Sequence, residues 1–271
     1  MSFSLEEIHD RLFEMLCLVD DICTREGITY YLDGGTELGS LREHDLIAWD
    51  DDMDIKVMAS DYPRFREVLS AHLPDYLRIT EPEDLGERFG DFVFRLVDTR
   101  DLLREVTQRD EALDNFDNHP DIDIFIVSNA SSSKLGRLFQ KFKYRVLYGL
   151  ALGHRPMLDM SEYHGVAKAS VLILGCVGRL CSMKGLYRAF RRITFNTDTN
   201  KGNYRVSFSG PMMKGRPPFV RAQAFDEVTY GQLRGRNFPV CAGYDEWLTA
   251  LYGDWKTPVC NKEIYIQHIE R

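Results

Sequence analysis

The sequence has no apolar stretch long enough to cross a bilayer as a single helix. Its most apolar run, Val166–Cys181, contains Lys168 and Arg179, which leave ten uncharged residues between them. A spanning helix needs about 20 apolar residues. The N-terminus also lacks a basic segment followed by an apolar core, so we expect no secretory signal. These absences predict a cytoplasmic protein.

Closely spaced cysteines are missing as well. The six Cys residues are scattered, and the two closest pairs are separated by six and five positions. Neither spacing is typical of a zinc site, and no repeat at a solenoid period is present. We therefore expect reduced, mostly buried thiols, and we exclude a disulfide scaffold, a zinc-finger module and a repeat protein.

The 271 residues are 44% hydrophobic and 12% aromatic, which is typical of a globular protein. The net charge of -8 hides a strong segregation along the chain. Residues 1–130 carry 12 Lys and Arg against 32 Asp and Glu, residues 131–205 carry 14 against 3, and residues 206–271 carry 8 against 7. The first segment is therefore suited to cations, and the second to a phosphorylated ligand, an anionic polymer or a membrane surface.

Two interpretations of the basic segment remain open. The apolar run Val166–Cys181 precedes the basic, amphipathic stretch Ser182–Ile193. These are either a core helix with a solvated neighbour or helices lying peripherally on the anionic, cytoplasmic face of a membrane. No aromatic interleaving or nucleic-acid motif accompanies the positive charge, so we expect no nucleic-acid partner.

Periodicity predicts a mixed α/β fold. Apolar residues at helical spacing predict a helix from Leu5 that stops at Gly27. The double glycine predicts a turn, with a short helix starting at Thr36. Further helices are expected from residue 62, over 133–148 and over 244–253, with strands at 28–33, 52–58, 76–80, 91–98, 102–107 and 121–127, a loop over 196–221 and a strand pair over 224–240.

The acidic run DDDMD is the first candidate site. Asp52 and Asp54 lie two positions apart in an expected strand, so their side chains share one face. At roughly 6–7 Å between their Cα atoms they can share a hard divalent cation such as Mg²⁺. The alternating Met53 and Ile55 would pack into the core and hold the site rigid.

A second strand repeats this arrangement. Asp121 and Asp123 alternate with isoleucines in Asp121–Val127. If this strand lies beside the first, Asp123 completes a three-carboxylate cluster, which needs a metal because desolvated like charges raise each other's pKa. Such a cluster with a bound cation is suited to phosphoryl transfer.

Residues upstream of the acidic run provide a candidate phosphate-binding wall. Gly34, Gly35 and Thr36 join a strand to a helix start, where backbone N–H groups can approach a phosphate, and Arg42 can add a planar charged fork. Each element alone is weak evidence. An acidic loop without function is the plain alternative.

Three further alternatives concern neighbouring residues. Asp50, Asp52 and Asp54 resemble the start of an EF-hand loop, but Ile55 and Asp61 stand where that loop needs glycine and glutamate. Trp49 could stack on a nucleotide base or pack in the core. His44 could contact the donor phosphate or be an incidental loop histidine.

Three stretches together carry a family resemblance, namely Tyr30–Phe65, Pro120–Val127 and Phe225–Pro258. They resemble the LicD family, which includes bacterial phosphocholine transferases and, more distantly, fukutin and fukutin-related protein. Glu37 stands where members more often have an apolar residue. The resemblance implies an α/β nucleotidyltransferase-like mixed sheet flanked by helices. Residues 1–130 would form the catalytic core, 131–205 a helical basic insertion, and 206–271 a block packing on the core.

The resemblance also implies an activity. A substituted phosphate such as phosphocholine would pass from a CDP-alcohol to a sugar hydroxyl of a cell-surface polysaccharide or glycolipid, releasing CMP. It implies Mg²⁺ or Mn²⁺ as cofactor, held by Asp50, Asp52, Asp54 and Asp123. Asp123 would also accept the hydroxyl proton, and Asp121 would lie at the same site with a less defined role. Gly34, Gly35, Thr36 and Arg42 would contact the donor phosphates. The rivals are a nucleotidyltransferase that releases pyrophosphate from an NTP and a non-catalytic module that binds anionic glycan.

Overall fold

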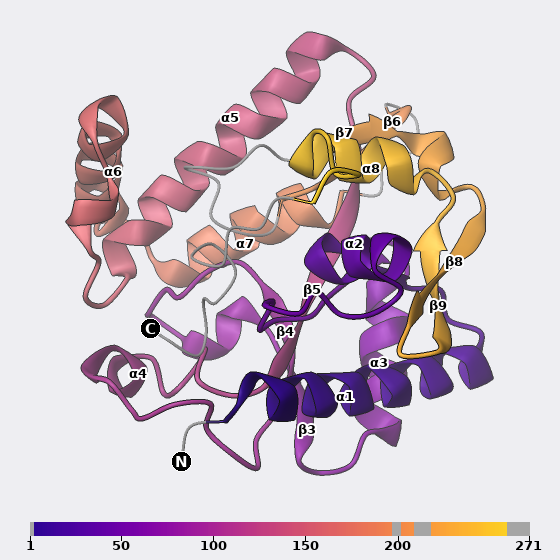
Figure 1. The fold of residues 1–271 in the computed structure, drawn as a ribbon. Helices are drawn as coiled ribbons and strands as arrows, with labels where there is room; N and C mark the ends of the chain where they lie inside the picture. Colours follow the sequence, from indigo (N-terminus) through magenta and orange to yellow (C-terminus); the bar gives the residue numbers. More distant parts are fainter. Residues whose placement is uncertain (1–2, 197–201, 209–217, 259–271) are drawn as a thin grey trace.

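A computed structural model describes residues 3–196, 202–208 and 218–258 (Figure 1). Within these residues a seven-stranded mixed sheet has the path β1-β2-β5-β4-β3, with β6 paired to β5 and β7 paired to β6. A separate antiparallel hairpin is formed by β8 and β9. The strands are β1 (Tyr31–Leu32), β2 (Asp54–Met58), β3 (Leu77–Thr80), β4 (Phe94–Asp98), β5 (Asp121–Ala130), β6 (Tyr204–Ser207), β7 (Phe219–Arg221), β8 (Val228–Leu233) and β9 (Arg236–Cys241).

Eight α-helices flank these strands in the described residues. They are α1 (Leu5–Glu26), α2 (Gly34–Arg42), α3 (Tyr62–His72), α4 (Gln108–Ala112), α5 (Lys134–Ala151), α6 (Gly165–Gly178), α7 (Met183–Thr194) and α8 (Tyr244–Tyr252). The first begins with a capping box between Ser4 and Glu7 and ends at Gly27 with φ +63°, as its sequence predicts. The mixed α/β fold is thereby confirmed.

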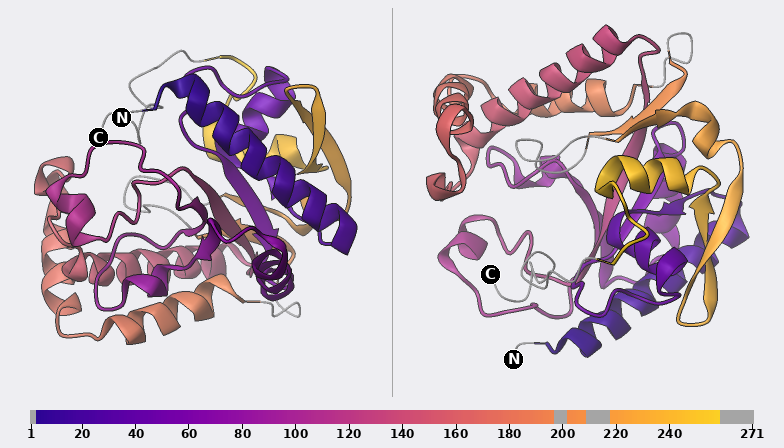
Figure 2. Two further views of the ribbon diagram at one scale, coloured as in Figure 1. Left: turned by 90° about the horizontal axis from the view of Figure 1, so that it is seen from below. Right: turned by 45° about the horizontal axis from the view of Figure 1, so that its top comes forward.

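The two faces of the sheet differ in character. Ile55, Ile124 and Phe94 lie on one face, in a core shared with α1, α3 and α7. Alternate positions on β2, β4 and β5 place Asp54, Lys56, Arg95 and Asp123 on the other face. There α2 and α8 lie side by side (Figures 1 and 2). The sheet therefore has a mainly apolar side, where Asp98 at the end of β4 pairs with Arg11 of α1, and a second side that carries several buried charges.

The basic middle segment is tied into the same core. Tyr144 and Tyr148 of α5 and Phe190 of α7 are buried against Phe92, whose ring stacks on Phe190 with 4.3 Å between centroids. By contrast, α6 lies at the edge of the molecule beside the end of α5 (Figures 1 and 2). No single helix among the described residues has the length and composition to cross a membrane. The pair α6 and α7, bent by 119° at their break, meets those criteria only when the two are counted together.

Several sequence-based assignments need correction. The helix α2 begins at Gly34 and includes the double glycine, whereas a turn there and a start at Thr36 were expected. Residues 102–107 form no strand, and Arg104 in this stretch pairs with Asp110 of α4 at 3.0 Å. The expected loop over 196–221 contains β6, which pairs with β5, and β7, which pairs with β6. Residues 197–201 and 209–217 of this stretch lie outside the described residues.

Candidate active site

The double glycine lies directly against the acidic run. A Cβ atom on Gly34 would stand 2.0 Å from Asp54 Oδ2, and one on Gly35 would stand 2.2 Å from Asp50 Oδ2. Gly34 also has φ +53°, which L side chains rarely adopt. Glycine is therefore required twice, because the carboxylates of Asp50 and Asp54 fill the space that side chains would need at the start of α2.

Hydrogen bonds fix β2 to this helix start. The Thr36 hydroxyl accepts a hydrogen bond from the Asp54 backbone N–H at 2.8 Å. The Asp33 N–H in turn donates to the Asp54 carbonyl at 3.0 Å. Both sides of Asp54 are thus held by the segment 33–36. Thr36 is 3% exposed, so the structure shows it holding the strand, while its predicted contact with a phosphate stays a prediction.

Strand pairing brings the second acidic strand alongside. β2 and β5 are parallel neighbours, and Asp54 is the register partner of Asp123. Burial, and then the neighbouring Asp52 and Asp123, raises the pKa of Asp54 well above its ordinary value. Burial and Asp52 likewise raise the pKa of Asp50 to about 9. The two acidic strands therefore lie side by side, which the expected carboxylate cluster required.

One arginine partly balances this charge. Arg95 Nε lies 3.0 Å from Asp123 Oδ1 and 3.2 Å from Asp121 Oδ2. Its Nη2 also donates to Asp91 Oδ2 at 2.7 Å. Burial raises the pKa of Asp123 to about 8, although Arg95 opposes that rise. Asp123 therefore combines a basic carboxylate with a fixed orientation.

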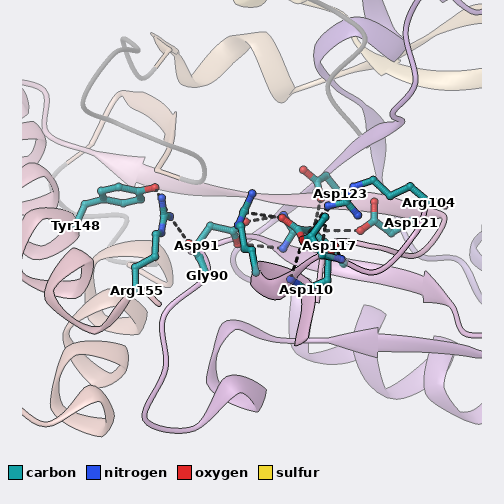
Figure 3. A network of polar contacts seen from close by, with 12 residues as sticks. Gly90, Asp91, Arg104, Asp110, Asp117, Asp121, Asp123, Tyr148 and Arg155 are labelled. Atoms are coloured by element: carbon teal, nitrogen blue, oxygen red, sulfur yellow. Dashed lines mark hydrogen bonds and ion pairs between the residues drawn. The ribbon is translucent and has the colours of Figure 1, made fainter. Parts of the chain in front are cut away.

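The polar network continues away from the sheet (Figure 3). Beyond Asp91, the Arg155 guanidinium donates to the Gly90 carbonyl and, at 3.1 Å, to the Tyr148 hydroxyl. The aspartate strand is thereby linked through the loop at 90–91 to α5. This explains how the basic segment, distant in sequence, helps to position β4 and β5.

A buried ion cluster supports the other side of the site. Lys56 is 0% exposed, and its Nζ lies 2.5 Å from Glu37 Oε2 and 3.3 Å from Asp33 Oδ1. The Trp247 ring centroid is 4.5 Å from Nζ, and the indole N–H donates to Asp33 Oδ1 at 2.6 Å. The expectation of a half-buried strand at 52–58 is wrong here, because both faces of β2 are buried. Glu37, the departure from the family pattern, pairs with Lys56.

Three further sequence-based candidates are Arg42, His44 and Trp49. Arg42 is at the far end of α2, about 12 Å along the helix from Gly34 by helical rise. It pairs with Glu43 and donates to the Trp255 carbonyl at 3.1 Å. His44 is exposed. Trp49 is half-buried and packs on a small apolar cluster.

The structure adds residues that sequence reasoning missed. Burial of its hydroxyl, followed by nearby Asp54, Asp33 and Asp50, raises the pKa of Tyr252 well above its ordinary value. This tyrosine of α8, whose side chain as a whole is 42% exposed, thus interacts electrostatically with those carboxylates. No pattern in the sequence distinguishes Tyr252. For Lys56 the alternation of the strand gave one indication, because the residue lies two positions after Asp54 and so shares its face.

The protein is thus of the mixed α/β class, with aspartates on two adjacent parallel strands beside a helix that begins at a double glycine, an arrangement that the resemblance to the LicD family led us to expect. Comparison with known proteins agrees. Residues 27–135 match the model of the LicD/FKTN/FKRP nucleotidyltransferase domain. This segment belongs to that domain family, and the resemblance to the LicD family is confirmed.

Two relatives illustrate the range of similarity. The chain is 23% identical to the lipopolysaccharide cholinephosphotransferase LicD of Haemophilus influenzae over 245 residues, which is 86% of this chain and 84% of that protein. It is also 33% identical to an uncharacterized protein of Rickettsia typhi over 58 residues, or 21% of this chain and 19% of that one. The first similarity extends well beyond the matched domain.

Proposed function

We propose that this protein transfers phosphocholine, or another phospho-alcohol, from a CDP-alcohol to a sugar hydroxyl of a cell-surface polysaccharide or glycolipid. The observation that carries the proposal is the pairing of Asp54 with Asp123 on parallel strands, with the Asp54 and Asp50 carboxylates packed on the double glycine. The similarity to a lipopolysaccharide cholinephosphotransferase over most of both chains supports this choice of reaction.

The chemistry of the donor set fits a hard divalent cation. Asp50 and Asp54 are buried and Asp123 is half-buried, and the pKa values of all three carboxyls are raised, first by desolvation and also by neighbouring carboxylates. Added positive charge would stabilise their ionised forms. In the part of the chain that the structure describes, no group of three or more Asp, Glu, His or Cys side chains is positioned so that it could hold a metal ion. Binding would therefore require the carboxylates to turn toward the ion.

Asp50, Asp52 and Asp54 would hold Mg²⁺ or Mn²⁺, with Asp123 a further ligand in reach of the same face. When bound, the cation would neutralise the donor diphosphate and make its phosphorus more electrophilic. The first turn of α2, at Gly34 and its neighbours, would contribute backbone N–H groups to the donor phosphates. The distance of Arg42 from this turn speaks against a direct phosphate contact for that side chain.

Asp123 is the base in this mechanism. The acceptor hydroxyl forms a new O–P bond to the phosphorus that carries the alcohol, the bond to the CMP oxygen breaks, and the hydroxyl proton passes to Asp123. Burial raises the pKa of Asp123 and a bound cation would lower it again, which would leave the carboxylate ionised and able to accept the proton near neutral pH. Arg95, held at the same time by Asp91, keeps the Asp123 carboxylate in place during the transfer.

A product screen tests the proposal. The protein is incubated with Mg²⁺, lipopolysaccharide and, separately, CDP-choline, CDP-ribitol or each NTP, and the nucleotide products are identified. Release of CMP with label transferred from the alcohol to the glycan is expected. Pyrophosphate release from an NTP would instead indicate the nucleotidyltransferase alternative, and glycan binding without turnover of any donor would indicate a binding module.

A further inference from the structure

The helix α5 is apolar on two opposite faces. Its core-facing side contains the buried residues Tyr144, Leu147 and Tyr148. With about 100° of rotation per residue, four other apolar side chains fall within one arc of about 100° on the opposite side. These are Leu135, Leu138, Phe139 and Phe142, which are 54% to 80% exposed. The second face contributes nothing to the core.

The neighbouring helix α6 repeats this pattern. Its inner side is packed closely on α5, since a Cβ on Gly178 would stand 1.9 Å from the Leu150 carbonyl oxygen and one on Gly149 would stand 2.5 Å from Leu174 Cδ1. Its outer side, with the turn that follows, exposes Val166, Leu172, Ile173, Val177 and Leu180. Nine of the 16 large apolar side chains exposed in the described residues thus lie on α5, α6 and this turn.

Basic side chains border both apolar faces. On α5, Lys134 and Arg145 flank one edge of the stripe and Lys143 the other, with the Lys143 Nζ 4.5 Å from the Phe139 ring centroid. On α6, exposed Lys168 and Arg179 lie along one side of the outer face. An apolar stripe with cations at its edges is the pattern by which a helix inserts shallowly into an anionic bilayer surface.

We infer that the outer faces of α5 and α6, here called the α5–α6 face, dock on the surface of an anionic lipid bilayer. The apolar side chains enter the headgroup boundary while the flanking Lys and Arg contact lipid phosphates. Charge favours a bilayer over a second copy of this chain, because two copies of a segment with 14 basic and 3 acidic residues repel each other. The inference does not depend on the proposed reaction.

Vesicle sedimentation tests the inference on the full chain. Binding to phosphatidylcholine vesicles is measured with and without phosphatidylglycerol, at low and at high salt. We expect binding only with phosphatidylglycerol, weakened by salt. The variant Ile173→Ser/Leu180→Ser should bind at least about tenfold more weakly, because two exposed apolar side chains can no longer insert.

Two further variants complete the design. Lys143→Gln/Arg145→Gln leaves the apolar side chains in place and should lose about fivefold per removed cation. The matched control Val228→Ser/Tyr230→Ser removes exposed apolar side chains from β8 and should bind as the wild type does. Absence of wild-type binding to phosphatidylglycerol, equal binding without it, or unchanged binding by both α5–α6 variants would overturn the inference. The inference would also be overturned if sedimentation velocity showed that the wild type is a dimer without lipid and that Ile173→Ser/Leu180→Ser is a monomer.

Discussion

Replacing Lys56 by methionine tests how the charged side of the sheet is held together. The substitution keeps an unbranched side chain of similar length and removes the charge that lies 2.5 Å from Glu37 Oε2 and 3.3 Å from Asp33 Oδ1. Lys56 and Glu37 are both 0% exposed, so water cannot take the place of the ammonium group. Breaking a buried pair from one side costs about 3–5 kcal/mol. We expect a loss of that size in the free energy of unfolding.

The loss should depend on pH in a stated direction. Burial raises the pKa of Glu37 to about 7, even with Lys56 beside it. A carboxyl whose pKa is raised in the folded state destabilises that state when it ionises. The cost grows as pH rises from the unfolded pKa to the folded pKa and is constant above it. Without Lys56 that cost increases further. The difference between Lys56→Met and wild type should therefore be smaller at about pH 5 than at about pH 8.

Urea unfolding at both pH values measures the effect, with Lys256→Met as matched control. Lys256 Nζ lies 2.7 Å from Asp245 Oδ1, but the two side chains are 67% and 60% exposed. An exposed pair contributes about 0–1 kcal/mol, so this variant should change little. The double variant Lys56→Met/Glu37→Leu should recover much of the loss, since one unpaired carboxylate is removed. A loss below about 1 kcal/mol for Lys56→Met at about pH 8 would refute the reasoning.

Two further predictions concern the glycine contact and acid stability. Gly34→Ala should remove most CMP release and cost more than the roughly 1–2 kcal/mol of left-handed strain, because its Cβ displaces Asp54 Oδ2 from a position 2.0 Å away. The control Gly235→Ala, with φ +80° and nothing within 4 Å of the new Cβ, should show strain alone and keep activity. Equal effects of the two on activity would contradict the contact. Burial tends to raise the pKa of Asp98, but hydrogen bonds from Arg100 and Arg11 outweigh it and hold that pKa below its ordinary value. The stabilisation by Asp98 is present above the ordinary aspartate pKa and is lost as pH falls through the lowered pKa. Asp98→Asn should therefore lower the free energy of unfolding by about 1–3 kcal/mol at neutral pH and should flatten the acid limb of a plot of that free energy against pH. An unchanged acid limb would count against this role.

The sequence predicted the pairing of Asp54 with Asp123 because strand alternation is a strong local signal, whereas Asp52, expected on the same strand, lies before β2 begins at Asp54. Asp54 and Asp123 each lie between apolar residues, so each was expected to project from the strand face opposite its apolar neighbours. In the structure β2 and β5 are parallel neighbours that pair Asp54 with Asp123, as we expected. The strand pair at β8 and β9 and the helix α8 were also predicted, since apolar periodicity and the turns that bound them are visible locally.

The sequence could not predict what depends on contacts between distant segments. Lys56 reads as a polar strand residue, and its burial depends on Trp247, which is far along the chain. Arg95 gains its role only when β4 pairs with β5. β6 and β7 lie in a polar stretch, where β6 pairs with the distant strand β5 and β7 pairs with β6. Arg42 was placed near the phosphates by sequence distance, while the helix puts it at the opposite end.

CMP release from CDP-choline with Mg²⁺ and lipopolysaccharide tests the central claim most directly. Wild type is compared with Asp52→Asn, Asp54→Asn and Asp123→Asn, and with the control Asp114→Asn, whose side chain is 70% exposed and pairs with Arg88 away from the site. We predict that each of the three site variants loses at least about a hundredfold in turnover, while the control is unchanged. Wild-type turnover by both Asp52→Asn and Asp123→Asn would contradict the account.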